Sequence, residues 1–269
     1  MAKPRILFIS QEIAPYIPST TASNIGRLLP TSMQSKGYEV RTFMPKFGAV
    51  NERRNQLHEV IRLSGANIVI NDNDHPLVIK VASMQPSRIQ VYFIDNEDYF
   101  QKNDDDAEHS GANREDNDER AIFFARGAME TAKKLRWDPT IIQCSGWITS
   151  LVPLYLKKFY GDDPSFKSTK IIYFISPGAS PESINEKIFT KLKADGFNQR
   201  DIKKITAEPN DPNFLHKIAI DNSTAVIIYE GDNTEAIVNY AKETNKPYMV
   251  VSKDSDIDVE KFTEFYKSL

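Results

Sequence analysis

Short runs of β-branched and aromatic residues alternate along this chain with segments of helical periodicity. Arg5 to Ser10 reads RILFIS, residues 23–36 carry apolar side chains at helical spacing, and YEVRTFMP follows directly after Gly37. A buried strand, a helix and a second strand in this order predict a βαβ unit. The same rhythm returns from a predicted helix at 117–136 to the end of the chain. The pattern favours an α/β fold: a Rossmann-like, doubly wound, mostly parallel sheet with helices on both faces.

Two segments interrupt this rhythm. Residues 51–95 hold β-type runs separated by Gly, Asn-Asp and Pro-Ser turn signals, with no room for helices, so we expect a β-rich antiparallel excursion there. Residues 102–117 are polar and acidic, which predicts a mobile surface loop. At 269 residues the chain fits one large α/β domain, and we expect residues 1–269 to form it. The run WITSLVPLYLKKFY, from Trp147, predicts one helix that Pro153 bends.

Composition excludes several classes of function. A net charge of −3 provides no basic field for nucleic acid, and no apolar run approaches the ~18 residues that span a bilayer. The single cysteine, Cys144, and the lack of a signal-peptide core predict a cytoplasmic protein. The four histidines lack the spacing of a helical metal site, and neither common glycine-rich nucleotide pattern occurs. We therefore expect no metal, no cofactor, no nucleic-acid partner and no membrane contact.

The loop after the first strand has an unusual content. The stretch QEIAPYIPSTTASNIGRLLP, Gln11 to Pro30, stands where many α/β proteins place a glycine-rich phosphate loop. Pro18 removes a backbone N–H, and the β-branched Thr20 and Thr21 resist the positive φ that such a cradle uses. We expect an ordinary helix start instead, capped by Ser23 or Asn24.

Ligands of such sheets bind beyond the carboxyl ends of the strands. Glu12 is the carboxylate nearest to this predicted crevice, and it is either a ligand or general base, or an acceptor of backbone N–H groups from the following loop. No histidine follows these strands, so we assign no catalytic nucleophile. Arg53, Arg54 and His58 in the β-rich excursion have two readings, site residues or exposed loop charges, and we expect loop charges.

These segments resemble the N-terminal half of the bacterial glycogen synthases and plant starch synthases. That family, glycosyltransferase family 5, has the GT-B arrangement, in which two Rossmann-like domains face each other across a cleft. Its opening segment E-[VI]-A-P-[FY] and the frame after it match here without a gap at Glu12, Ala14, Pro15, Tyr16, Leu29, Pro30, Gly37, Val40, Pro45 and Gly48. Its K-T-G-G run falls on Pro18, Ser19, Thr20 and Thr21.

Two further blocks carry the resemblance. Residues 115–137, EDNDERAIFFARGAMETAKKLRW, are similar to the family's D-N-x-x-R-F-x-F-F-x-R segment. PTIIQCSGWITSLVPLYLKK is similar to its H-x-H-D-W-H-T block, in which Trp147 and Thr149 fit. The three histidines of that block fall on Gln143, Ser145 and Ile148, and its aspartate falls on Gly146.

The family transfers glucose from ADP-glucose to an α-1,4-glucan, and its second domain would follow the last residue here. The resemblance therefore implies half of a GT-B enzyme that is inactive alone and binds an α-glucan, ADP-glucose or a partner. Family position implies these substrate-binding residues: Glu12, Tyr16, Ser19, Gln143, Ser145, Trp147 and Thr149. Trp147, Tyr16 and Tyr99 are candidates for stacking on sugar rings.

Two alternatives stay open. In the first, the chain is an active glucosyltransferase that a separate donor-binding chain completes. In the second, it is a scaffold or interaction protein. A scaffold or homo-oligomer would use the exposed cleft face, which should then be unusually apolar.

Overall fold

The computed structural model describes residues 3–101, 111–231 and 234–269. Its centre is a ten-stranded sheet with strand order β10-β9-β8-β7-β1-β2-β6-β5-β3, and β4 pairs with β5. The strands are β1 (Arg5–Ser10), β2 (Glu39–Pro45), β3 (His58–Glu59), β4 (Ala66–Ile70), β5 (Asn73–Met84), β6 (Ile89–Asp95), β7 (Ile141–Ser145), β8 (Lys170–Ile175), β9 (Ala225–Tyr229) and β10 (Tyr248–Val251).

The helices alternate with the parallel strands. The α-helices are α1 (Thr21–Ser35), α2 (Asn117–Leu135), α3 (Val152–Tyr155), α4 (Ile188–Ala194), α5 (Gln199–Lys203), α6 (Phe214–Asn222), α7 (Thr234–Glu243) and α8 (Val259–Ser268). Shorter helical turns of other types are η1 (Glu97–Gln101), η2 (Trp147–Thr149) and η3 (Leu156–Tyr160).

The strand order confirms the predicted doubly wound fold. β1 lies between β2 and β7 and pairs parallel with both. From β1 the chain adds strands in one direction through β2 and β6, and later in the opposite direction through β7, β8, β9 and β10. The junction of β1 and β7 is therefore the switch point of the sheet, where ligand sites of this architecture form. Both strands are buried almost throughout, as continuous apolar runs of a parallel sheet should be.

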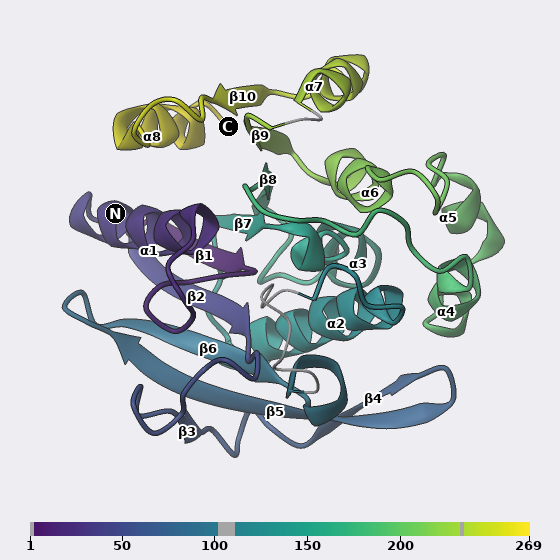
Figure 1. Cartoon of the computed structure of the whole chain (residues 1–269), viewed down its shortest axis with the longest axis horizontal. Coiled ribbons are helices and arrows are strands. Elements are labelled where there is room, and N and C mark those ends of the chain that lie inside the picture. Colours follow the sequence, from purple (N-terminus) through teal and green to yellow (C-terminus); the bar gives the residue numbers. More distant parts are fainter. Residues whose placement is uncertain (1–2, 102–110, 232–233) are drawn as a thin grey trace.

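Helices cover both faces of the sheet (Figure 1). α1 and the C-terminal α8 lie together on one side, while α2, α3, α6 and α7 lie on the other. The Lys36 ammonium contacts Glu260 of α8 at 2.5 Å, and Phe262 of α8 packs edge-on against Phe174 of β8 with ring centroids 6.0 Å apart. α8 thus closes the apolar surface beside α1, near the switch point.

The segment expected as a β-rich excursion contains β3, β4, β5 and β6. β4 and β5 form an antiparallel hairpin whose turn, Asn71 and Asp72, has positive φ values of 52° and 62°. Asparagine and aspartate tolerate this conformation better than most side chains, so the Asn-Asp signal marks a real turn. β6 then pairs parallel with β2, which joins these strands to the main sheet. Of the predicted acidic loop 102–117, residues 102–110 lie outside the described residues.

The region after β7 differs from its prediction as one bent helix. It forms three consecutive pieces, η2, α3 and η3, and Pro153 lies in the first turn of α3. Proline lacks an N–H, and the first helical turn is where that group has no intrahelical acceptor. Pro153 therefore begins a new short helix where a bend was expected.

Candidate functional site

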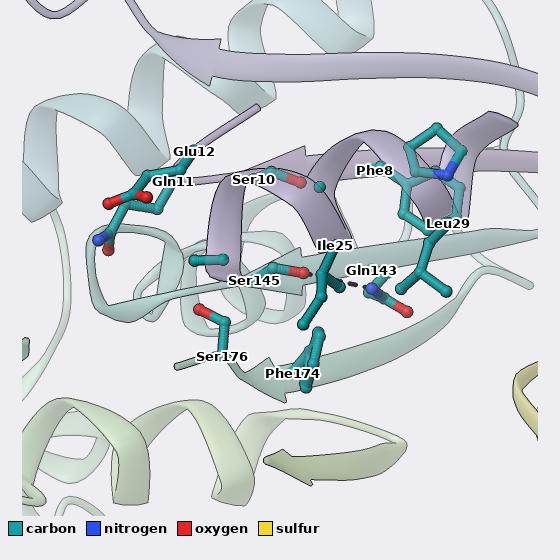
Figure 2. A pocket seen from close by; sticks show the side chains of 13 residues that line it. Phe8, Ser10, Gln11, Glu12, Ile25, Leu29, Gln143, Ser145, Phe174 and Ser176 are labelled. Atoms are coloured by element: carbon teal, nitrogen blue, oxygen red, sulfur yellow. Dashed lines mark hydrogen bonds between the residues drawn. The ribbon is translucent and has the colours of Figure 1, made fainter. Parts of the chain in front are cut away.

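A narrow crevice lies at the switch point of the sheet. It is lined from β1 and the residues after it by Ser10, Gln11 and Glu12, from β7 by Gln143 and Ser145, and from the first turns of α1. Figure 2 shows Ser145 and Gln143 on either side of Ile25 of α1, with Phe174 of β8 next to Ile25. The crevice holds about 10 Å³, which is about the volume that a single water molecule needs. In this conformation it admits neither a sugar ring nor a nucleotide.

Thr20 closes the loop that leads into α1. Its backbone is extended, with φ −122° and ψ 167°, and its hydroxyl oxygen accepts the Ser23 N–H at 2.9 Å. In return, the Thr20 N–H donates to the Ser23 hydroxyl oxygen at 2.9 Å, which completes a capping box. The expectation that Ser23 or Asn24 caps the helix is therefore wrong. Since Thr21 already belongs to α1 and Thr20 has negative φ, this turn uses none of the left-handed backbone of a glycine loop.

Glu12 is bound by the same cap. The Thr20 hydroxyl donates to the Glu12 carboxylate at 2.6 Å. We expected Glu12 either to act as a ligand or general base, or to accept hydrogen bonds from backbone N–H groups of the loop. Its hydrogen-bond partner is instead a side-chain hydroxyl of that loop, from Thr20. Glu12 thus helps to hold the loop against the end of β1.

Gly26 lets α1 lie directly on the residues after β1. A Cβ atom at this position would lie 2.2 Å from the backbone carbonyl oxygen of Glu12. No side chain fits there unless the helix moves, so the width of the crevice depends on this glycine.

Gln143 and Ser145 of the crevice are hydrogen-bonded within the protein. The Gln143 amide donates to the Ser145 hydroxyl at 3.2 Å, and the Tyr266 hydroxyl of α8 donates to the Gln143 carbonyl oxygen. Gln143 and Tyr266 are both buried. Tyr266 follows Gln143 by 123 positions, so sequence spacing gave no signal that α8 completes this site.

The three aromatic residues expected to stack on sugars are buried in the core. Exposed fractions are 1% for Trp147, 4% for Tyr16 and 2% for Tyr99. Tyr16 packs edge-on against Phe93 with centroids 5.0 Å apart, and the Tyr99 hydroxyl donates to Glu119 at 2.9 Å. In this conformation the three rings are too deeply buried to stack on a ligand, although Tyr16 also lines the open cavity described below.

Trp147 and Thr149 instead hold the turn after β7. The Arg120 guanidinium lies 5.6 Å from the centre of the Trp147 ring and donates to the Asn117 side-chain oxygen at 2.7 Å. The Thr149 hydroxyl donates to the Gly146 carbonyl at 2.8 Å. Asn117 and Arg120 belong to the D-N-x-x-R block and Trp147 to the W-x-T block, so the two matched blocks meet in space.

The structure explains why a glycine, Gly146, occupies the position of the family's aspartate. Its φ is 91°, and an added Cβ would lie 2.7 Å from the Gln11 side chain. A residue with a side chain would be strained there in both backbone and packing.

An open cavity of about 470 Å³ lies on the outer side of the loop after β1. Tyr16 and Ser19 line it from that loop, Arg27 from α1, and Arg54 from the turn after β2. We call this cavity the arginine hollow; its full lining is Ala14, Pro15, Tyr16, Ile17, Pro18, Ser19, Asn24, Arg27, Ala49, Asn51, Arg54 and Asn55. It contains no carboxylate, so its charge is positive.

The structure divides the predicted site residues into three groups. Glu12, Gln143 and Ser145 line the crevice. Tyr16 and Ser19 line the arginine hollow. Trp147 and Thr149 are buried away from both cavities. The sequence reading missed Arg27 and treated Arg54 as an ordinary loop charge; only the folded chain brings the loops after β1 and β2 together.

Other kinds of site find no support in the described part of the chain. No three histidine, cysteine, aspartate or glutamate side chains gather there in a way that could hold a metal ion. No helix of that part is long and apolar enough to cross a bilayer.

The sheet is Rossmann-like and doubly wound, and both cavities lie at the carboxyl ends of its strands, where ligand sites of this architecture form. The family model for the starch synthase catalytic domain matches residues 5–247. The chain therefore belongs to the starch synthase catalytic-domain family, as its resemblance implied.

Several curated proteins that are similar in sequence to this chain are glycogen synthases. The enzyme of Chlorobium luteolum is 34% identical over 189 residues, which cover 70% of this chain and 39% of that protein. The enzyme of Chlorobaculum tepidum is 36% identical over 172 residues, covering 64% of this chain and 35% of that protein. The chain thus spans less than half the length of these relatives.

A solved structure has the same fold. The catalytic domain of starch synthase IV from Arabidopsis thaliana, bound to ADP and acarbose, superposes with a TM-score of 0.74 at 16% identity. The match covers 97% of this chain and 53% of that one. The fold is therefore that of the first part of a starch synthase catalytic domain.

Proposed function

We propose that this chain binds an α-glucan in the arginine hollow and does not by itself transfer glucose from a nucleotide sugar. The observation that carries the proposal is the closed loop before α1, in which Thr20 caps the helix and holds Glu12. Where the family has K-T-G-G, the polar groups of this loop bind one another.

The loop argues against transfer on physical grounds. As a nucleotide sugar breaks, negative charge builds on the diphosphate, and preorganised donors must already point at it. Pro18 offers neither a charge nor an N–H, and the Thr20 N–H donates to Ser23. Removing one preorganised donor costs about 10²–10³ in rate, so the loss of several leaves no useful catalysis.

The arginine hollow supports glucan binding. Its volume of about 470 Å³ is typical of small-ligand sites, which run from about 300 to 1,000 Å³. Arg54, Asn51 and Asn55 offer guanidinium and amide groups that suit the hydroxyls of a sugar chain. The related starch synthase IV was solved with the oligosaccharide acarbose.

A scaffold role has less support than glucan binding. The large apolar side chains that are exposed in the described part of the chain are Leu28, Ile61, Val69, Phe159, Tyr248 and Val250. They belong to α1, the residues before β4, β4, η3 and β10, and none lines the crevice or the arginine hollow. Completion by a separate donor-binding chain remains the alternative that an experiment must exclude.

A transfer assay tests the proposal. Purified protein is incubated with ADP-glucose and glycogen, and glucose incorporation is measured beside a variant with Pro18→Lys, Ser19→Thr, Thr20→Gly and Thr21→Gly. We expect no incorporation by the unchanged chain, while glycogen co-sediments with it. Incorporation by the purified unchanged chain would contradict the proposal. Incorporation that appears only when a separate donor-binding chain is added would support the alternative instead. Incorporation gained by the variant would locate the defect in the loop.

A further inference from the structure

A third cavity, of about 540 Å³, lies near the amino ends of β9 and β10. It is formed by η3, α5, the end of α6, and Thr244 and Lys246 before β10. Because these segments lead into the amino ends of β9 and β10, the cavity is remote from the switch-point crevice. We call it the basic pocket; its charged lining is Lys157, Lys158, Lys204, Lys246, Asp201 and Asp221.

Both carboxylates of the basic pocket already have partners. Asp201 lies 2.6 Å from the Lys158 ammonium and accepts the Asn198 N–H at 2.9 Å in the cap of α5. Asp221 accepts the Tyr240 hydroxyl at 3.0 Å. The Asp201 charge is therefore paired, while Asp221 keeps its charge near Lys157 and Lys246. The four ammonium groups of the pocket still outnumber its two carboxylates.

Lys246 has a structural role. Its ammonium donates to the carbonyl oxygens of Ile220, Asp221 and Ser223 at 2.5, 2.7 and 2.7 Å, which satisfies the end of α6. All three of its donors are thereby used. Lys246 contributes positive charge to the pocket but no further hydrogen bond.

Lys157 and Lys204 are different. Neither ammonium forms an ion pair with any residue that the structure describes. Burial and then the nearby Lys157 charge lower the pKa of Lys246 to about 8. Positive charges thus crowd this pocket, and a bound anion would relieve their repulsion.

The other walls suit the uncharged part of a ligand. Leu154, Phe197 and Ile218 form a buried apolar floor. The Asn222 amide donates to the Ile218 carbonyl at 2.8 Å, which leaves its own carbonyl oxygen as an acceptor. The Thr244 hydroxyl donates to the Ala241 carbonyl at 2.7 Å and likewise keeps its lone pairs. These two acceptors would bind hydroxyl groups.

We propose that the basic pocket binds a small polyhydroxylated phosphate monoester. Lys157 and Lys204 contact the phosphate, and Asn222 and Thr244 accept hydrogen bonds from hydroxyl groups. The volume of about 540 Å³ lies within the usual range for small-molecule sites, about 300 to 1,000 Å³. This site is separate from the proposed glucan site. The basic pocket lies near the amino ends of β9 and β10, whereas the arginine hollow lies beyond the carboxyl ends of β1 and β2.

Calorimetric titration with ribose 5-phosphate tests this site. The full chain is compared with a Lys157→Gln/Lys204→Gln double variant and with Lys203→Gln, which changes an exposed lysine next to the pocket. Because the double variant loses both ammonium groups that contact the phosphate, it should bind at least about tenfold more weakly. Lys203→Gln should bind as the unchanged chain does. Thermal unfolding of each variant reports whether it is folded.

Control titrations use ribose and inorganic phosphate in place of ribose 5-phosphate. We expect no binding of ribose, weaker binding of inorganic phosphate than of ribose 5-phosphate, and loss of affinity as salt rises. The proposal is overturned if ribose 5-phosphate shows no binding at a concentration of about 10 mM. Equal affinity in the folded double variant, or equal affinity for inorganic phosphate, would overturn it as well.

Discussion

Replacing Lys191 with methionine is expected to destabilise the protein by about 3–5 kcal/mol, because it leaves a buried carboxylate without its partner. The Lys191 ammonium of α4 lies 2.5 Å from Asp118 and 2.8 Å from Glu119 of α2. The Asp118 side chain is 0% exposed. Burial acts to lower the pKa of Lys191, but hydrogen bonds and attraction from the two carboxylates outweigh it and raise that pKa above its usual value. Burial also raises the pKa of Asp118, against the hydrogen bond and the charge of Lys191, which lower it. Lys191 is charged at neutral pH, and its removal leaves Asp118 buried without that partner.

Urea unfolding measures this effect. Lys193→Met is the matched control, since Lys193 is exposed on the same helix, and it should change the free energy of unfolding by less than about 0.5 kcal/mol. Adding Asp118→Asn to Lys191→Met should recover part of the loss, because no charge then stays buried alone. A loss from Lys191→Met as small as that from Lys193→Met would show that the pair does not hold α4 to α2.

Gly26→Ala is expected to destabilise the protein by about 1–3 kcal/mol or more through overpacking. In an exposed helix this change normally stabilises by about 1 kcal/mol, so the sign of the effect is itself informative. The reason is the 2.2 Å approach that the new Cβ would make to the Glu12 carbonyl oxygen. Relief requires α1 to move away from the end of β1, which would also separate Thr20 from Glu12.

Thermal and urea unfolding report the sign, with Leu28→Ala on the same helix as the control. Leu28 is 41% exposed, so its truncation should cost much less than that of a core leucine. If Gly26→Ala stabilised the protein, α1 would not be packed on Glu12 as described.

Local pattern was enough to predict most of the fold. The apolar run of β1, the periodicity of α1 and the helix stop at Gly37, whose φ is 92°, are each decided by neighbouring residues. The helix expected at 117–136 spans Asn117–Leu135 for the same reason. Alternation of such elements then leaves few topologies, of which the doubly wound sheet is one.

The candidate site was harder to predict because distant segments build it. Tyr266 reaches Gln143 from the last helix, and Arg54 joins Arg27 in a hollow that neither segment forms alone. Family position and aromatic type suggested that Trp147 stacks on sugar, yet it is buried and the Arg120 guanidinium from α2 lies over its ring. The expected caps of α1 were Ser23 and Asn24, but Thr20 is the cap, and its hydroxyl also contacts Glu12.

Titration with maltoheptaose, an α-1,4-linked glucose oligomer, tests the central claim most directly. Calorimetry is the suitable readout, since both tryptophans, Trp137 and Trp147, are buried and poorly placed to report binding by fluorescence. Arg54→Ala removes a guanidinium from the arginine hollow, while Arg53→Ala removes an exposed neighbour outside it. We predict that the unchanged chain and Arg53→Ala bind maltoheptaose equally and that Arg54→Ala binds about tenfold more weakly, a loss of about 1.4 kcal/mol. Absence of binding at millimolar maltoheptaose, or equal binding by the folded Arg54→Ala variant, would contradict the account.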